Sequence, residues 1–398
     1  MGLIVSNAKG RYFFRKMRKV YFDHSATTPV RSEVAEEMVR YFTGDFGNPS
    51  SLHLWGRKVR RAVEEAREKV ACGIGAKPEE IVFTSGGTES DNMAVKGAAY
   101  ANRRKGNHII TSAVEHHAVL DTCKALREEG FTLTILPVDS YGMVRMEDVA
   151  EAIQEKTILI SIMHANNEVG TIQPISEIGR LVREKGILLH TDAVQSIGKI
   201  PVNVDDLQVD FLAVSGHKLY APKGVGVLYI RQDAEWQPVS HGGGQERKCR
   251  PGTENVSGIV ALGKAMELAV FDLPGESQRL AKLRDKIIQG VMDKIPRVRL
   301  NGHPTKRLPN LINFIFESVD SKSLLASLDM EGIAASSGSA CSAGFTKPSH
   351  VLLAMGVSPE IARGSLRLTL GRDNSDEDVE YFLNVLPAVL DRLSNVTS

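Results

Sequence analysis

The stretch ILLHTDAVQSIGKIPVNVDDLQVDFLAVSGHK, residues 187–218, contains two short apolar runs, each followed by polar residues. The first run leads to Asp192, and the second leads to the segment Ser215–Lys218. Apolar runs of this length are typical of strands that are buried on both faces of a sheet. Further runs of this kind alternate with helical patterns such as Arg57–Val70, in which apolar residues form one stripe. The alternation predicts an α/β fold in which helices cover a mostly parallel sheet.

Composition and charge restrict the class of protein. The 398 residues are 42% hydrophobic and 24% charged, which is ordinary for a globular protein of two subdomains. A formal net charge of +1 argues against a nucleic-acid-binding protein, and no apolar run is long enough to predict a membrane span. The four cysteines lie far apart without a CxxC pair, so we expect reduced thiols in a cytoplasmic protein.

The two ends of the chain differ from its middle. The first eighteen residues carry five basic side chains and no acidic one, which is typical of a targeting segment or of an extension that precedes the folded domain at Met17. We favour the extension. After about Leu273 the pattern changes to a long helix followed by the strand LPNLINFIFESV, which predicts a smaller α/β domain.

The carboxyl ends of parallel strands are where ligands bind in such folds. The strand Ile81–Thr84 leads into Gly86 and Gly87, which allow a tight turn, and Thr88 then begins a helix. A helix N-terminus of this kind favours a phosphate group. The segment is not GxGxxG and has no Walker lysine, so it predicts neither a dinucleotide nor a nucleoside-triphosphate site.

Asp192 and Lys218 each follow a predicted strand, and together they suit pyridoxal phosphate. This cofactor needs a lysine for its Schiff base and a carboxylate against its pyridinium nitrogen. Ser215 and His217 lie beside the lysine and are suited to the cofactor's phosphate. Alone, the lysine or the aspartate reads as an ordinary surface or capping residue. The joint arrangement favours the cofactor.

Two histidines, His116 and His117, follow the strand HIITSAV. One of them is placed to lie on the cofactor ring and to act as an acid or a base near neutral pH. A metal site is the alternative, but adjacent side chains point in different directions and no second cluster of ligands follows. We expect no resident metal ion.

The segment SSGSACSAG, residues 336–344, contains a single cysteine, Cys341, among residues no larger than serine. Small residues build no core and have weak helix and strand preferences, so residues of about 334–347 are predicted to form a mobile loop. A mobile loop would let the thiol reach into a pocket and then present what it carries to an acceptor outside.

Together these residues resemble the NifS/IscS-type cysteine desulfurases, which are class-V aminotransferase-family, fold-type I pyridoxal-phosphate enzymes. The resemblance runs from about Val20 to the C-terminal region. It rests on YFDHSATTPV, FGNPSSLH, FTSGGTESDN, TSAVEHHAVLDTC, HANNEVGT, HTDAVQSIGK, SGHKLYAPKG, GGGQERKCRPGTEN, SSGSACSAG and SLRLTLGR, in the family's order.

The resemblance implies a role for each matching residue. It implies that Lys218 is the Schiff-base lysine, that Asp192 is the pyridinium partner, and that Cys341 is the catalytic cysteine. The remaining implied contacts are Gln195 to the ring hydroxyl, His116 stacked on the ring, Gly87, Thr88, Ser215 and His217 to the phosphate, Thr253 to the phosphate of a neighbouring subunit, Asn167 to cofactor and substrate, and Arg367 to the substrate carboxylate.

The implied activity is conversion of L-cysteine to L-alanine by a homodimer, with transfer of sulfur as a Cys341 persulfide to acceptors for iron–sulfur cluster assembly and other products. The implied fold is a large domain (28–273) with a mostly parallel seven-stranded sheet, a small domain (19–27 and 274–398), and the extension 1–18. His116 is the candidate to deprotonate the substrate thiol. A transient iron–sulfur ligand role for Cys341 and the identity of the acceptor stay open.

Alternative functions remain at this point. They are a selenocysteine lyase or another fold-type I lyase or transaminase, a cysteine–histidine hydrolase, and a non-catalytic iron–sulfur scaffold. The chain also departs from the family at RKCR, where Lys248 and Arg250 flank Cys249 and are expected to lower its pKa. We nonetheless regard Cys249 as incidental, and we expect Cys72 and Cys123 to be packed on helices.

Overall fold

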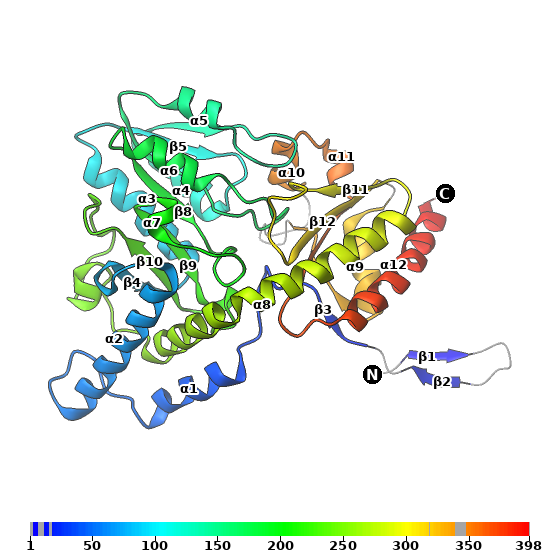
Figure 1. Cartoon of the computed structure of the whole chain (residues 1–398), viewed down its shortest axis with the longest axis horizontal. Helices are drawn as coiled ribbons and strands as arrows, with labels where there is room; N and C mark the ends of the chain where they lie inside the picture. The colour runs from blue at the N-terminus through cyan, green and yellow to red at the C-terminus, as the bar shows by residue number, and fades with distance from the viewer. Residues whose placement is uncertain (1–2, 7–11, 16–17, 318, 339–347, 398) are drawn as a thin grey trace.

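A seven-stranded sheet lies at the centre of the larger part of the molecule (Figure 1). The computed structural model describes residues 3–6, 12–15, 18–317, 319–338 and 348–397. The strand order is β4-β10-β9-β8-β7-β5-β6, and within this sheet β10 alone runs antiparallel to its neighbours. The predicted mostly parallel seven-stranded sheet is therefore confirmed. The strands are β4 (Ile81–Thr84), β5 (His108–Ser112), β6 (Thr132–Leu136), β7 (Thr157–Ser161), β8 (Leu188–Asp192), β9 (Phe211–Ser215) and β10 (Gly226–Ile230).

Helices cover both faces of this sheet. In β4, Ile81 and Phe83 belong to the hydrophobic cluster that includes α2, whereas Val82 belongs to the cluster that includes α3 and α4. Successive side chains of a strand point to opposite faces, so both faces must be apolar. The helical segments of this part are α1 (Ser32–Thr43), α2 (Leu54–Ile74), η1 (Pro78–Glu80), α3 (Gly87–Asn102), α4 (His117–Glu128), α5 (Met146–Ala152), α6 (Ile175–Arg183), α7 (Val204–Leu207), η2 (Gly216–Lys218) and η3 (Gln245–Lys248).

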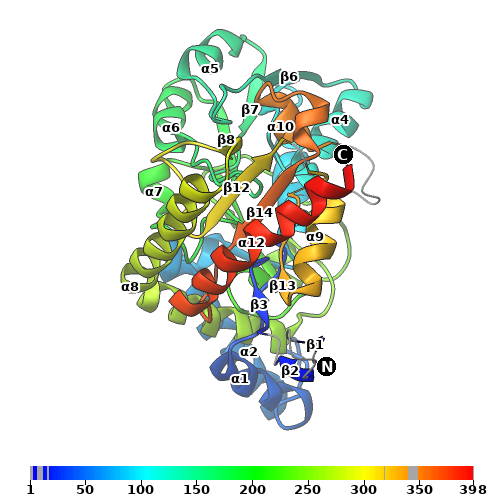
Figure 2. The same cartoon turned by 90° about the vertical axis from the view of Figure 1, so that its right-hand side faces the viewer.

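A second, antiparallel sheet in the order β11-β12-β14 forms the smaller part, with α9 and α12 beside it (Figure 2). A short parallel pair, β13-β3, brings the segment after Lys19 to this part of the molecule. The elements are β3 (Val20–Tyr21), β11 (Val298–Asn301), β12 (Leu311–Phe316), α9 (Ser321–Met330), β13 (Ile333–Ala334), α10 (His350–Ala354), α11 (Pro359–Ala362), β14 (Ser365–Thr369) and α12 (Asp376–Thr397).

One helix, α8 (Val256–Lys294), belongs to both parts (Figure 1). Met266 in its first half packs under the large sheet, and Leu283 in its second half packs against the small one. The prediction that this helix starts near Leu273 is wrong. The helix continues through Pro274, because one lost backbone hydrogen bond is outweighed by burial on both sides of the proline.

Two further strands lie near the N-terminus, β1 (Leu3–Ser6) and β2 (Tyr12–Arg15). They pair antiparallel with each other, outside both sheets (Figure 1). Among the described helices, none has the length and apolar character that crossing a lipid bilayer requires.

A strained turn precedes α8. Glu246, Arg247 and Lys248 all adopt left-handed backbone angles, with φ of 42°, 53° and 69°. The Glu246 carboxylate holds this turn, because it accepts bonds of 2.8 Å from both terminal nitrogens of the buried Arg67 and from the backbone N–H of Phe83. Bidentate, charge-assisted bonds of this kind are strong enough to hold a disfavoured backbone.

Replacing the exposed Lys248 with glycine is expected to raise the free energy of unfolding by about 0.5–1 kcal/mol. A left-handed conformation costs a side chain about 1–2 kcal/mol, and the extra entropy of unfolded glycine offsets part of the relief. Thermal or denaturant unfolding measures the change. Lys248→Ala is the matched control, because it removes the same side chain but keeps the Cβ atom; equal stability of both variants would contradict the strain.

Candidate active site

A cavity of about 460 Å³ opens where the parallel strands of the large sheet end. Segments after β4, β5, β7, β8 and β9 line one side of it, and Ser25, Ala26 and Arg367 close it from the other side. It also brings together nearly all the predicted site residues, namely Gly87, Thr88, His116, Asn167, Asp192, Gln195, Ser215, His217, Lys218 and Arg367. Thr253 is exposed and does not line the cavity. Cys341 lies outside the described residues.

Lys218 lies at the end of η2, directly after β9. Its Nζ atom donates hydrogen bonds to the carbonyl oxygens of Ser25 (2.5 Å) and Ala26 (2.6 Å). These carbonyls belong to the segment after β3, 193 and 192 residues away in the sequence. The amine is thus oriented by neutral acceptors and by the two parts of the molecule together.

Asp192 ends β8 and is 6% exposed. Its Oδ1 atom accepts a bond of 2.9 Å from the backbone N–H of Val194. Burial raises the pKa of this carboxyl, and the nearby His116 and Lys218 act in the opposite direction. A buried carboxylate of this kind is stabilised by a cationic N–H partner, and a pyridinium nitrogen is such a partner.

The environment behind Asp192 is built from neutralised groups. Burial, followed by the charges of Asp192 and Glu115, raises the pKa of Asp91 well above its usual value. Burial raises the pKa of Glu115 to about 8 and lowers that of His190, whose Nε2 lies 3.4 Å from Asp91 Oδ1, to about 3. Neutral neighbours behind Asp192 leave its carboxylate as the charged group on that side of the cavity.

The turn between β4 and α3 forms a cradle. Gly86 has φ 154° and ψ −177°, a region that glycine alone adopts readily, and it provides no side chain to cap the first amides of α3. A Cβ atom on Gly87 would lie 2.8 Å from a methyl group of Val194. The uncapped start of a 16-residue helix favours an anion.

Ser215 and His217 stand opposite this cradle in the same cavity. A Cβ on Gly87 would lie 3.6 Å from that of Ser215, so the hydroxyl group is close to the start of α3. Burial, followed by the charges of Lys218 and Lys223, lowers the pKa of His217 to about 4. His217 is therefore a neutral hydrogen-bonding group at pH 7.

His116 precedes α4 and caps it. Its Nδ1 atom accepts a bond of 3.1 Å from the backbone N–H of Ala118. Because a backbone N–H always donates, Nδ1 carries no proton, and the neutral ring has its proton on Nε2. In this state His116 offers the cavity an N–H donor rather than a base.

Arg367 is delivered by β14 of the small sheet, and its side chain is 3% exposed. Its guanidinium donates to the carbonyl oxygen of Asn167 (3.0 Å) and to Asp23 Oδ1 (2.8 Å). Its Nε atom is buried and has no hydrogen-bond partner among the described residues. The contact between Arg367 and Asn167 is therefore made by the Asn167 backbone. The carboxylate of Asp23 binds the guanidinium group where the carboxylate of a ligand could bind instead.

The residues Ser25, Ala26, Asp23 and Lys223 were not assigned roles from the sequence. The first three lie in the quoted motif YFDHSATTPV, and Lys223 lies in SGHKLYAPKG. Their motifs were the available signal. The sequence alone does not show that Ser25 and Ala26 contact Lys218, or that Asp23 contacts Arg367.

The cysteines differ from expectation in two respects. Cys123 on α4 is buried as predicted, and burial raises its pKa to about 12. Cys72 on α2 is exposed, so its predicted packing is wrong. The expectation of a lowered pKa at Cys249 is also wrong, because burial raises it more than Arg247 lowers it. Within the described residues, no three histidine, cysteine or acidic side chains gather as metal ligands.

Comparisons with known proteins agree with the geometry. The family model described as Aminotransferase class-V matches residues 20–382. The chain is 53% identical over 395 residues to the cysteine desulfurase IscS of Methanosarcina thermophila, covering 99% of this chain and 98% of that protein. It is 54% identical over 380 residues to the cysteine desulfurase IscS of Dictyoglomus turgidum, covering 96% of each.

Two solved structures are similar throughout. One is a NifS-like protein, with a TM-score of 0.89 and 42% identity, covering 94% of this chain and all of that one. The other is SspA in complex with cysteine, with a TM-score of 0.77 and 39% identity, covering 88% of this chain and 99% of that one.

Proposed function

Because this chain belongs to the class-V aminotransferase family and, within it, to the NifS/IscS-type cysteine desulfurases, we propose that it converts L-cysteine to L-alanine. The sulfur passes to Cys341 as a persulfide and from there to acceptors for iron–sulfur cluster assembly and other sulfur-containing products. The observation that carries this proposal is the joint placement of Lys218, Asp192 and the Gly87 cradle in one cavity. The chain also matches a protein named cysteine desulfurase over nearly the full length of both.

Pyridoxal phosphate fits the residues present. Gln195 has a buried Oε1 atom with no hydrogen-bond partner among the described residues, which suits the ring hydroxyl. Asp192 suits the ring nitrogen, the start of α3 with Ser215 and His217 suits the phosphate, and Lys218 would hold the cofactor through Nζ. When bound, this cofactor supplies an electron sink that stabilises negative charge at the substrate Cα.

Lys218 is the proposed proton carrier at Cα. Its amine takes the Cα proton of L-cysteine while the Ser25 and Ala26 carbonyls limit where the amine can lie. Arg367 binds the substrate carboxylate, which its planar guanidinium group can hold through two parallel hydrogen bonds. The Nε atom has no partner among the described residues, and the substrate carboxylate replaces Asp23 at the nitrogen that Asp23 now binds. Asn167 orients Arg367 through its carbonyl oxygen.

Cys341 is the proposed sulfur acceptor. Its thiolate attacks the sulfur of the substrate, so that an S–S bond forms and the Cβ–S bond breaks with its electron pair staying on carbon. Protonation of the three-carbon fragment then gives alanine, and no external oxidant or reductant is needed. His116, with its proton on Nε2, would face the cofactor as a hydrogen-bond donor. To take a proton from the substrate thiol at Nε2, it would first have to carry its own proton on Nδ1 and give up the bond from Ala118.

The assembly and location belong to the same proposal. Thr253 is exposed and outside the cavity of its own chain, which suits a contact to the phosphate site of a second copy in a homodimer. The three described cysteines are free thiols, which suits a reducing, cytoplasmic environment. A sulfur-acceptor protein, such as an iron–sulfur scaffold, is the expected partner.

The deciding experiment measures L-alanine and the visible absorbance of the purified protein supplied with pyridoxal phosphate and L-cysteine. A coloured protein that releases one alanine for each sulfur passed to a thiol acceptor supports the proposal. A colourless protein supports the hydrolase instead, and iron binding without alanine supports a scaffold. Alanine from L-selenocysteine but none from L-cysteine contradicts the desulfurase and supports a selenocysteine lyase.

A further inference from the structure

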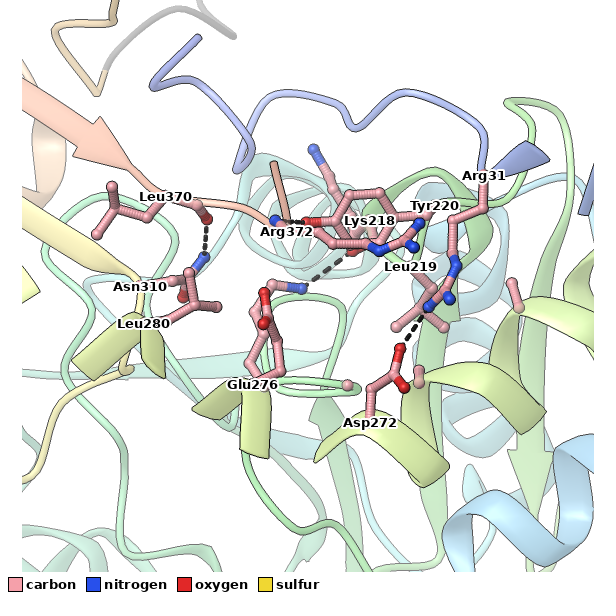
Figure 3. A pocket seen from close by; sticks show the side chains of 14 residues that line it. Arg31, Lys218, Leu219, Tyr220, Asp272, Glu276, Leu280, Asn310, Leu370 and Arg372 are labelled. Atoms are coloured by element: carbon pink, nitrogen blue, oxygen red, sulfur yellow. Dashed lines mark hydrogen bonds and ion pairs between the residues drawn. The ribbon is translucent and has the colours of Figure 1, made fainter. Parts of the chain in front are cut away.

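Lys218 also lines a second, smaller cavity of about 40 Å³ (Figure 3). It lies between η2, α8 and the end of β14, where the two parts of the molecule meet. Lys218, Tyr220, Arg31 and Arg372 surround it in Figure 3. The same cavity contains Lys199, a lysine that the proposed mechanism does not use.

Lys199 is 6% exposed, in the turn that follows β8. Its Nζ atom donates to the backbone carbonyl oxygen of Lys218 at 3.0 Å and, at 3.5 Å, to that of Ile197. In the described part of the chain it forms no ion pair with a carboxylate. A buried ammonium group without an anion is unusual, because burial without a partner is costly.

Two carboxylates of α8 line this cavity, and both are paired with arginines. Asp272 binds Arg31 at 2.6 Å, and Glu276 binds Arg279 at 2.8 Å. Arg31 also binds Glu33, at 3.0 Å. The negative charges that α8 brings to the cavity are therefore paired with arginines.

Besides the carboxyl group of Asp373, the other titratable groups around Lys199 are Tyr220 and His24, and both are neutral at pH 7. Burial raises the pKa of Tyr220 to about 12, and its phenol oxygen accepts from the backbone N–H of Arg372. Burial, followed by the charge of Lys199, lowers the pKa of His24 to about 4. Asp373 interacts with Tyr220 and His24, but its influence is smaller than that of burial.

The remaining neighbour that affects the pKa of Lys199 is Lys218. Burial lowers the pKa of Lys199 to about 7, and the charge of Lys218 is the second cause. The influence between two like charges is reciprocal, so a proton on Lys199 also disfavours a proton on Lys218.

We propose that Lys199 is a positioning residue for the reaction: it fixes the backbone of Lys218 through the carbonyl oxygen, and in its protonated form its positive charge favours the unprotonated form of the Lys218 nitrogen. The inference rests on the proposed role of Lys218 as the lysine that holds the cofactor and moves the Cα proton. A base at Cα works only when it is unprotonated, so a protonated Lys199 bound to the Lys218 backbone serves the chemistry without touching the substrate.

The test compares the holoenzyme with Lys199→Met, which removes both the charge and the hydrogen bond, and with Lys199→Gln, which keeps a donor but no charge. The readout is the pH midpoint at which the visible absorbance of the bound cofactor changes. Loss of the charge raises the pKa of the nitrogen of Lys218, so both variants are expected to shift the midpoint to higher pH by about one unit. The rising limb of the pH profile of alanine release should move with it.

Lys282→Met is the matched control, because Lys282 is an exposed lysine of α8 with no hydrogen bond or ion pair among the described contacts. It should leave the midpoint unchanged. An unchanged midpoint in both Lys199 variants overturns the proposal. An unchanged midpoint in Lys199→Gln alone also overturns it, because the effect of Lys199 would then come from its hydrogen bond and not from its charge. If Lys199→Met does not fold, Lys199→Gln decides. Failure of the proposed function is distinct, because the wild type itself would then lack the absorbance or the alanine.

Discussion

Replacement of Lys218 with alanine is expected to lower the rate of alanine release from L-cysteine by at least about 10³-fold. The variant loses the amine that the carbonyl oxygens of Ser25 and Ala26 hold inside the cavity. It thereby loses the proposed attachment point of the cofactor and the proposed proton carrier at Cα. Water cannot replace an amine held at a fixed position beside the substrate.

Attachment can be measured separately from activity. Wild-type protein treated with borohydride and then denatured should retain the cofactor, whereas Lys218→Ala should release it. Lys218→Arg is the matched variant, since it keeps a cation that can donate to the same two carbonyls but provides no nucleophilic amine. We expect it to be as inactive as Lys218→Ala. Cofactor retained by either variant after this treatment would mean that another lysine, of which Lys223 is nearest in the chain, holds it.

Replacement of Cys341 with alanine is expected to reduce alanine release by on the order of 10²-fold or more while the visible absorbance stays that of the wild type. The cavity residues that hold the cofactor are unchanged in this variant, so binding should persist. What is lost is the nucleophile for the substrate sulfur. Mass spectrometry after incubation with L-cysteine should find an added sulfur on the wild type and none on the variant.

Cys72→Ala is the matched control for this substitution. Cys72 is an exposed free thiol on α2 that does not line the cavity, so its loss should leave both alanine release and persulfide formation unchanged. Normal alanine production by Cys341→Ala would contradict the persulfide route. It would leave the cofactor site intact and point to a lyase that eliminates sulfur without a protein thiol.

The sequence was sufficient to predict those residues of the cavity that follow a strand. Asp192 ends one strand and Lys218 follows its parallel neighbour, and the carboxyl ends of such strands must meet at one edge of the sheet. Burial of β4 and β9 at every position likewise follows from their apolar composition. Local pattern and sheet geometry together therefore placed one side of the site.

The other side of the site could not be predicted from local pattern. Asp23 binds Arg367, which lies 344 residues away, and the carbonyls that hold Lys218 are backbone groups, which every residue has. Nothing in the composition of these segments distinguishes such pairing from ordinary loops. The exposure of Cys72 was missed for a related reason, because helix periodicity does not say which stripe of α2 meets the rest of the protein.

Helix α8 couples the stability of the two hydrophobic cores, because it packs against both. Its 39 residues extend over about 58 Å, and the stretch around Val270 and Phe271 is exposed between the cores. An isolated half of such a helix is marginally stable in water, so each core supplies the burial that keeps the other half wound. Loss of either core should therefore fray the shared helix and weaken the other. Hydrogen exchange along α8 would then report one cooperative opening, with the lowest protection at the amides that neighbour Pro274, which itself has no amide hydrogen.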